Sequence, residues 1–83
     1  MLDAKIVGKV IQKYREEKGL SQEVLSGLAG IGRSHLSAIE RGERRPTLDT
    51  FFKIGEALGI GPSVLMSAVE IAIAEGEDKQ ANK

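Results

Sequence analysis

The chain has 83 residues, with 12 basic residues balanced by 12 acidic ones, 41% hydrophobic residues and no cysteine. A chain of this length builds one small domain around a single core. The missing cysteine excludes disulfides, thiolate metal sites and a cysteine nucleophile. The longest apolar run, residues 64–74, is too short to cross a bilayer, and the first residues lack a signal-peptide pattern. We therefore expect a cytoplasmic protein with no membrane partner.

The charges are distributed unevenly. Residues 31–47 carry four arginines against two glutamates, a net charge of +2, whereas residues 48–83 carry three lysines against six acidic residues, a net charge of −3. A local basic patch on a neutral protein is compatible with a polyanionic partner that is contacted on one side only.

Helical periodicity dominates the sequence, and strand alternation is absent. A first helix is predicted between the N-cap Asp3 and the Lys-Gly pair at 18–19. A second follows the N-cap Ser21, and further helices begin near residue 33, at residue 47 and after the Gly-Pro-Ser at 61–63. The domain is expected to occupy residues 1–74 with an extended fifth helix, followed by a polar, disordered tail at residues 75–83.

Apolar positions predict which side chains form the core. In the second helix, Leu25, Leu28 and Ala29 are expected to face inward. Gly27 and Gly55 lie inside predicted helices, where glycine costs about 1 kcal/mol relative to alanine. Close approach of another helix would explain both glycines, and loose helices held only by tertiary packing are the alternative.

A short turn at residues 30–32 joins the second and third helices, which is the helix-turn-helix arrangement. The sequence resembles the phage-repressor/Cro-like (Xre) family over about residues 4–66. The resemblance implies an all-α, five-helix, lambda-repressor-like DNA-binding domain. The residues that carry it are Gly19-Leu20-Ser21-Gln22, Leu25, Ala29-Gly30-Ile31, Ser34, Leu36-Ser37, Ile39-Glu40-Arg41-Gly42 and Arg45-Pro46-Thr47-Leu48.

The outer face of the third helix is small, polar and cationic, because Ser34, Ser37, Ala38 and Arg41 lie roughly opposite the core-facing side. By the resemblance, Arg33, Ser34 and Ala38 contact base edges in the major groove. An ordinary solvated helix face is the alternative interpretation. The residues expected to contact phosphates are Gln22, Ser37, Arg41, Arg44 and Arg45. By the resemblance, Gln22 also braces the third helix.

Other positions are predicted to support the scaffold. The family commonly pairs the positions of Arg15 and Glu40, and we expect this ion pair to lock the third helix onto the first. Gly32 replaces the usual Ser or Thr cap of the third helix. Ser26 replaces a common alanine, so its hydroxyl needs a backbone acceptor. His35 lies on a flank of the third helix and has no second histidine or cysteine with which to bind a metal.

The fifth helix is apolar over an arc of roughly 220° at 100° per residue, although one core-facing stripe needs little more than 100°. Leu65 and Val69 are expected to face the core. An excess apolar surface marks a partner, and a two-fold dimer would place two recognition helices about 34 Å apart on a palindromic operator. The residues expected to meet a second copy are Val64, Met66, Ile71 and Ile73.

These patterns predict a sequence-specific transcriptional regulator, with repression the favoured mode, that reads the major groove of DNA as a homodimer. No cofactor, metal or small-molecule effector is expected. An enzyme is not expected, because the two Gly-Ile-Gly pieces lack the third glycine and the preceding strand of a nucleotide site. The alternative is a protein-interaction module, or an antitoxin-type partner, that keeps the helix-turn-helix fold.

Overall fold

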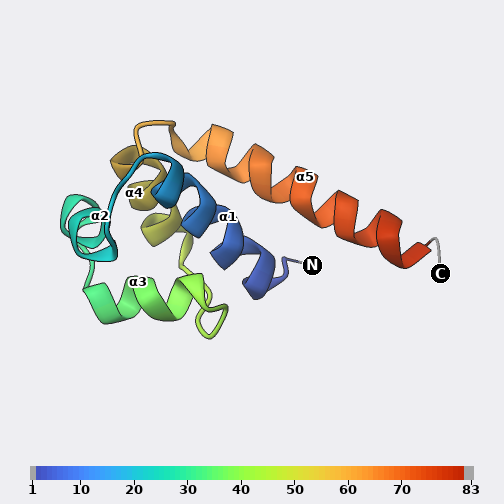
Figure 1. Cartoon of the computed structure of the whole chain (residues 1–83), viewed down its shortest axis with the longest axis horizontal. Coiled ribbons are helices and arrows are strands. Elements are labelled where there is room, and N and C mark those ends of the chain that lie inside the picture. Colours follow the sequence, from blue (N-terminus) through green and yellow to red (C-terminus); the bar gives the residue numbers. More distant parts are fainter. Residues whose placement is uncertain (1, 82–83) are drawn as a thin grey trace.

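Five helices follow one another along the chain in a computed structural model that describes residues 2–81, with side chains described for residues 2–76. They are α1 (Ala4–Glu17), α2 (Gln22–Ala29), α3 (Arg33–Glu40), α4 (Leu48–Ala57) and α5 (Pro62–Ala81) (Figure 1). The described residues contain no strand. The predicted all-α class is therefore confirmed.

Side-chain caps begin three of the first four helices. The side chains of Asp3, Ser21 and Thr47 each accept a hydrogen bond from a backbone N–H two or three residues further on. Gly30 ends α2 in the left-handed conformation, with φ of 71°, which favours glycine because it has no Cβ. Gly32 stands at the N-cap of α3 without a side-chain hydrogen bond.

The last helix, α5, continues to Ala81, past the expected end of the domain at residue 74. Residues 75–81 are rich in Glu, Lys, Gln and Ala, which are all good helix formers. They therefore prolong α5 as one continuous helix. Residues 82–83 of the expected tail lie outside the described residues.

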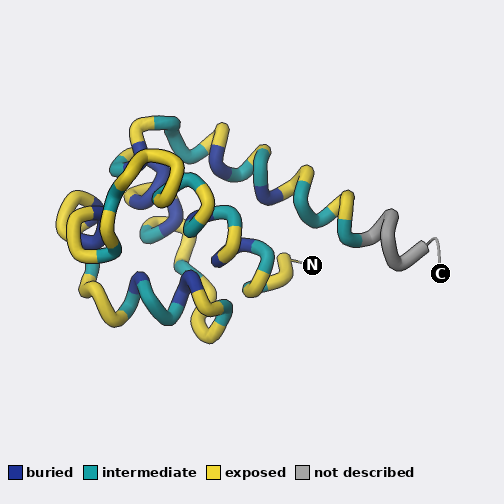
Figure 2. Tube along the Cα trace, viewed as in Figure 1, coloured by how far each residue is buried: buried dark blue, intermediate teal, exposed yellow. Residues whose placement is uncertain are grey.

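All five helices contribute buried side chains to one core (Figure 2). Leu28, which was expected in this core, is instead 62% exposed. The buried face of α2 is formed by Leu25, Ser26 and Ala29, and Leu28 points about 110° away from it at 100° per residue. The largest fully buried side chains are Ile11, Leu25, Leu36, Ile39, Ile54, Leu65 and Val69.

Two glycines allow helices to approach closely. A Cβ on Gly8 of α1 would overlap the backbone carbonyl of Glu40, and a Cβ on Gly55 of α4 would come within 2.7 Å of the Cα atom of Pro62. Gly27 is exposed, and apart from its chain neighbours and the nearby backbone of its own helix no atom lies within 4 Å of the position its Cβ would take. Close approach therefore explains Gly55 but not Gly27.

No single helix within the described residues is long and apolar enough to span a membrane. Taken together, α4 and the part of α5 up to Gly76 are long and apolar enough, but a bend of 108° lies between the two helices. Both helices contribute buried side chains to the core.

We expect Gly27→Ala to stabilise the fold by about 1 kcal/mol, because alanine gains helix propensity in open space. Gly55→Ala is the matched control and should destabilise the fold, because its Cβ meets the backbone of Pro62. Urea denaturation followed by circular dichroism measures both free energies of unfolding. A Gly27→Ala variant less stable than the parent would contradict the open environment of this position.

Candidate nucleic-acid interface

The turn at residues 30–32 joins α2 to α3, which lies along one side of the molecule (Figure 1). Leu36 and Ile39 of α3 are fully buried, which fixes the inward face of this helix. Arg33 and Ser34, in its first turn, are exposed, and Ala38 is half-buried. The three residues predicted to read bases therefore lie away from the core side chains of α3.

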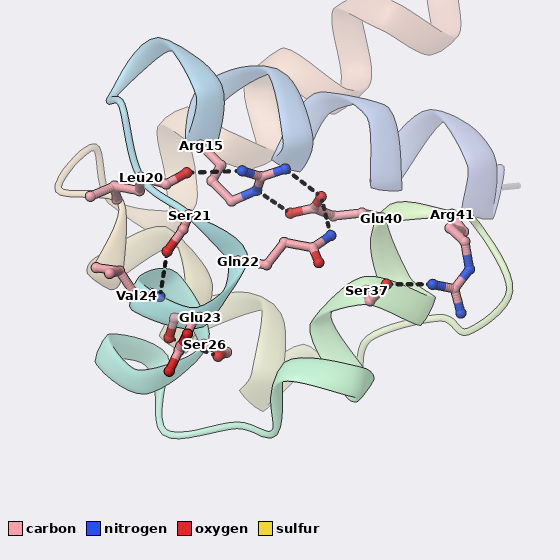
Figure 3. Close-up of polar contacts among 10 residues, drawn as sticks. All are labelled: Arg15, Leu20, Ser21, Gln22, Glu23, Val24, Ser26, Ser37, Glu40 and Arg41. Atoms are coloured by element: carbon pink, nitrogen blue, oxygen red, sulfur yellow. Dashed lines mark hydrogen bonds and ion pairs between the residues drawn. The ribbon is translucent and has the colours of Figure 1, made fainter.

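An ion pair buried between α1 and α3 holds α3 in place. Arg15 Nε donates to Glu40 Oε2 over 2.7 Å, and Arg15 Nη2 donates to Glu40 Oε1 over 3.0 Å (Figure 3). The two side chains are only 11% and 2% exposed. The pairing expected between these positions is thus present and bidentate, a geometry that fixes orientation as well as distance.

This pair is extended by two further hydrogen bonds. Arg15 Nη1 donates to the carbonyl oxygen of Leu20 over 2.8 Å, and Gln22 Nε2 donates to Glu40 Oε1 over 3.0 Å (Figure 3). Hydrogen bonding to Glu40 raises the pKa of Arg15 above its ordinary value. The network joins α1, the start of α2 and the end of α3, so all three elements share one polar anchor.

Gln22 is both a member of this network and a predicted phosphate contact. It was predicted to contact a phosphate and to brace α3, and in the structure its amide nitrogen bonds Glu40. Gln22 therefore braces α3 through its hydrogen bond to Glu40. A terminal amide carries two N–H groups, so a phosphate contact is compatible with this bond.

At the far end of α3, Arg41 is held by its neighbours. Its Nη1 donates to the Ser37 hydroxyl, and its Nε and Nη2 donate to the two carboxylate oxygens of Glu43 over 2.9 and 3.0 Å. These hydrogen bonds, and secondarily the attraction between the charges, raise the pKa of Arg41 and lower that of Glu43. Both side chains are exposed, so a phosphate can compete with Glu43 for the guanidinium.

The remaining predicted positions also have definite places. Arg44 and Arg45 are exposed in the segment between α3 and α4. The Ser26 hydroxyl donates to the carbonyl oxygen of Glu23 over 3.0 Å, which is the backbone acceptor that it was expected to need. His35 is half-buried. Within the described residues, no group of three or more His, Asp or Glu side chains could hold a metal ion.

The four apolar residues expected at a dimer interface lie on two stripes of α5. Val64 and Ile71 are exposed, whereas Met66 and Ile73 are half-buried and pack against the core. Each pair is seven residues apart and shares a helix face, and the two pairs are separated by about 200° at 100° per residue. Because one flat surface cannot contact both stripes, they represent two alternative faces.

A short turn between two helices, a second helix with a polar and cationic outer face, and arginines at its exit together define a helix-turn-helix DNA-binding domain. The helix-turn-helix family model matches residues 11–65 of the chain. The chain belongs to the helix-turn-helix family of Xre-type, phage-repressor-like transcriptional regulators.

Individual relatives have similar lengths. The chain is 36% identical to an uncharacterized HTH-type transcriptional regulator, y4dJ, of Sinorhizobium fredii, over 80% of this chain and 86% of that protein. It is 35% identical to the control protein C.BamHI of Bacillus amyloliquefaciens, over 84% of this chain and 88% of the relative.

Solved structures show the same fold. The restriction-modification controller protein C.AhdI of Aeromonas hydrophila is 38% identical, with a TM-score of 0.74 over 78% of this chain and 98% of that one. A C.Esp1396I controller protein, solved as a tetramer with its natural 35 base-pair operator, is 30% identical, with a TM-score of 0.81 over 89% of this chain and 97% of that one.

Glu40→Ala should destabilise the fold by about 3–5 kcal/mol, the usual loss when one partner of a buried ion pair is removed. Arg15→Ala should act in the same direction. Glu43→Ala is the matched control, since it breaks an ion pair that is exposed and should barely move the melting temperature. Thermal melting of the three variants checks this, and an unchanged melting temperature for Glu40→Ala would show that the pair does not support the fold.

Proposed function

We propose that this protein is a sequence-specific DNA-binding regulator that represses transcription by covering a palindromic operator as a homodimer. It acts on double-stranded DNA in the cytoplasm and needs no small-molecule effector. Arg33, Ser34 and Ala38 read base edges, and Gln22, Ser37, Arg41, Arg44 and Arg45 contact phosphates. Selection of bound sequences from a random duplex pool, followed by a reporter-gene assay of the selected operator, tests the proposal.

The observation that carries the proposal is the rigid presentation of α3. Its inner face is fixed by buried Leu36 and Ile39, and its C-terminal end is fixed by the Glu40 ion pair. Its first turn, with Arg33 and Ser34, is exposed. A preorganised helix with small polar residues on its outer face suits a major groove about 12 Å wide.

The relatives support the same function. The C.Esp1396I controller protein forms a complex with its operator, and C.BamHI is named a control protein. The C.Esp1396I protein shares the fold of this chain, and C.BamHI is 35% identical to it over 84% of this chain. The alternative, a protein-interaction module, predicts no shift of any duplex DNA in a low-salt electrophoretic assay.

Arg33→Ala should weaken binding to the preferred site by about 1–3 kcal/mol, because a guanidinium can bond guanine O6 and N7 together. Preference should relax at one base position in each half-site. Competition binding with single-base variants of the selected site measures both effects. Equal weakening of all sequences would make Arg33 a phosphate contact.

Arg44→Ala is the counterpart of that experiment. It should weaken binding to all sequences alike and reduce the salt slope by about one unit per half-site, because a phosphate contact releases a counterion without reading sequence. Titrations at several salt concentrations measure the slope. An unchanged slope would remove Arg44 from the interface.

For the dimer, we propose the stripe of Met66 and Ile73 as the contact face. Met66 lines an apolar hollow of about 220 Å³ together with Leu2 and Leu48. Leu48 is 80% exposed, and an exposed apolar cluster of this kind usually marks a partner surface. Arg45 borders the hollow, but no residue of α3 lines it, so a second copy seated there leaves the outer face of α3 free.

The other stripe faces a less suitable groove. Ile71 lines a groove of about 520 Å³ between α1 and α5 that includes the charged residues Lys9, Lys13, Glu17 and Glu75. A rim with four charges is costly to bury against a second copy. We therefore propose that Val64 and Ile71 remain exposed to solvent in the dimer.

Leu48→Glu should convert the dimer to a monomer at micromolar concentration and weaken operator binding. The fold should persist, because a carboxylate is favourable in the first turn of α4. Ile71→Glu is the matched control and should leave the dimer intact. Sedimentation equilibrium measures the oligomeric state of the parent and both variants. If Ile71→Glu dissociates and Leu48→Glu stays dimeric, the interface lies on the stripe of Val64 and Ile71. A monomeric parent would refute the dimer.

A further inference from the structure

A polar hollow of about 300 Å³ lies where α1, α2 and α3 meet. Lys5, Lys9 and Gln12 line it from α1, Gln22 lines it from the start of α2, and Glu40 and Arg41 line it from the end of α3. Lys5, Lys9 and Gln12 follow one another at four- and three-residue spacing, so they share one face of α1. The hollow is therefore a meeting point of three helices that are far apart in the sequence.

The charge in this hollow is positive. Its one carboxylate, Glu40, is paired with Arg15 inside the fold, and its Arg41 is paired with Glu43 at the surface. Among the residues whose side chains the structure describes, no ion pair involves Lys5 or Lys9. Three cations and two amide side chains thus face a space that a small anionic group can enter.

Close backbone packing sets the position of the two lysines. Gly42, with φ of 76°, lies directly against Lys5, since a Cβ on Gly42 would come within 2.6 Å of Lys5 Cγ. One turn further along α1, Gly8 touches the backbone of Glu40. The lysine face of α1 is therefore held at the exit of α3 by close contacts at two glycines.

We propose that this hollow binds a phosphate of the DNA backbone, with Lys5 and Lys9 as phosphate-contacting residues additional to those on α2 and α3. The inference rests on the proposed function. The DNA interface then extends from the helix-turn-helix to α1, along the DNA strand that passes the start of α2 and the end of α3. Lys5 and Lys9 then contribute affinity but no base preference, because phosphate contacts position the protein without reading sequence.

Continuity with the outer face of α3 favours DNA backbone over a free anion. Arg41 belongs both to the hollow and, through its bond to Ser37, to that outer face. Gln22 stands at the N-terminal end of α2, where helix N–H groups favour anions. Figure 3 shows the Gln22 amide below the Glu40 carboxylate and the Arg41 guanidinium farther to the right, turned toward Ser37. Both residues line the hollow, so a DNA strand that touches both passes it.

The test compares the parent with the double variant Lys5→Gln/Lys9→Gln, because glutamine keeps the Cβ and Cγ atoms that pack near Gly42. Affinity for the operator selected from the random pool is measured between 50 and 200 mM salt. Each phosphate that is no longer neutralised should reduce the salt slope by about 0.9. With one phosphate bound in the hollow, the parent should therefore lose about 3.5-fold more affinity per protomer over this range than the double variant. The ratio between the preferred site and its single-base variants should stay unchanged.

Lys53→Gln is the control, since it makes the same kind of substitution once on α4, where Lys53 pairs with Asp49, and its salt slope should match the parent. Melting temperatures check that all variants fold. Replacing single phosphates by neutral methylphosphonates should reveal positions that weaken the parent but not the double variant. A salt slope equal to the parent's, or a changed base preference, would overturn the α1 contact. A parent that binds no duplex would overturn the proposed function instead.

Discussion

The buried ion pair between Arg15 and Glu40 is the constraint on which the rest of the site depends. A carboxylate that is 2% exposed is costly unless every oxygen is bonded, and here its oxygens receive two bonds from Arg15 and one from Gln22. Those bonds leave little freedom for α1, α2 and α3 to move relative to one another. The angle at which α3 is presented follows from this network, and the side chains proposed to contact phosphates lie around it.

Local signals were sufficient to predict the fold. Caps such as Ser21 and Thr47 act within a few residues of themselves, and apolar spacing marks one side of a helix without reference to its neighbours. The turn between α2 and α3 and the spacing around it then gave the family, which the family model confirms. The ion pair of Arg15 with Glu40 came from that resemblance, because two residues 25 positions apart carry no local sign of their contact.

Features that depend on how helices face one another were not predictable. Leu28 belongs to an apolar pattern but lies beyond the edge of the buried face of α2. Gly27 and Gly55 are alike in sequence, yet only Gly55 meets another backbone. The apolar arc of α5 was taken as one surface, whereas α1 and α4 divide it into separate stripes. Lys5 and Lys9 were visible as a spaced pair, but their proximity to Gln22 and Arg41 exists only in three dimensions.

The direct backbone contacts at Gly8 and Gly42 have an evolutionary consequence. Because α1 rests on the end of α3 without intervening side chains, substitutions on the outer face of α3 do not disturb the seating of the helix. Arg33, Ser34 and Ala38 share no packing with these glycine contacts. With Arg33, Ser34 and Ala38 as the proposed base-reading residues, operator preference is free to diverge among descendants of one ancestor, while a Cβ at Gly8 or Gly42 meets a steric overlap. Duplicated copies of such a gene can thereby acquire separate targets through a few changes in one helix.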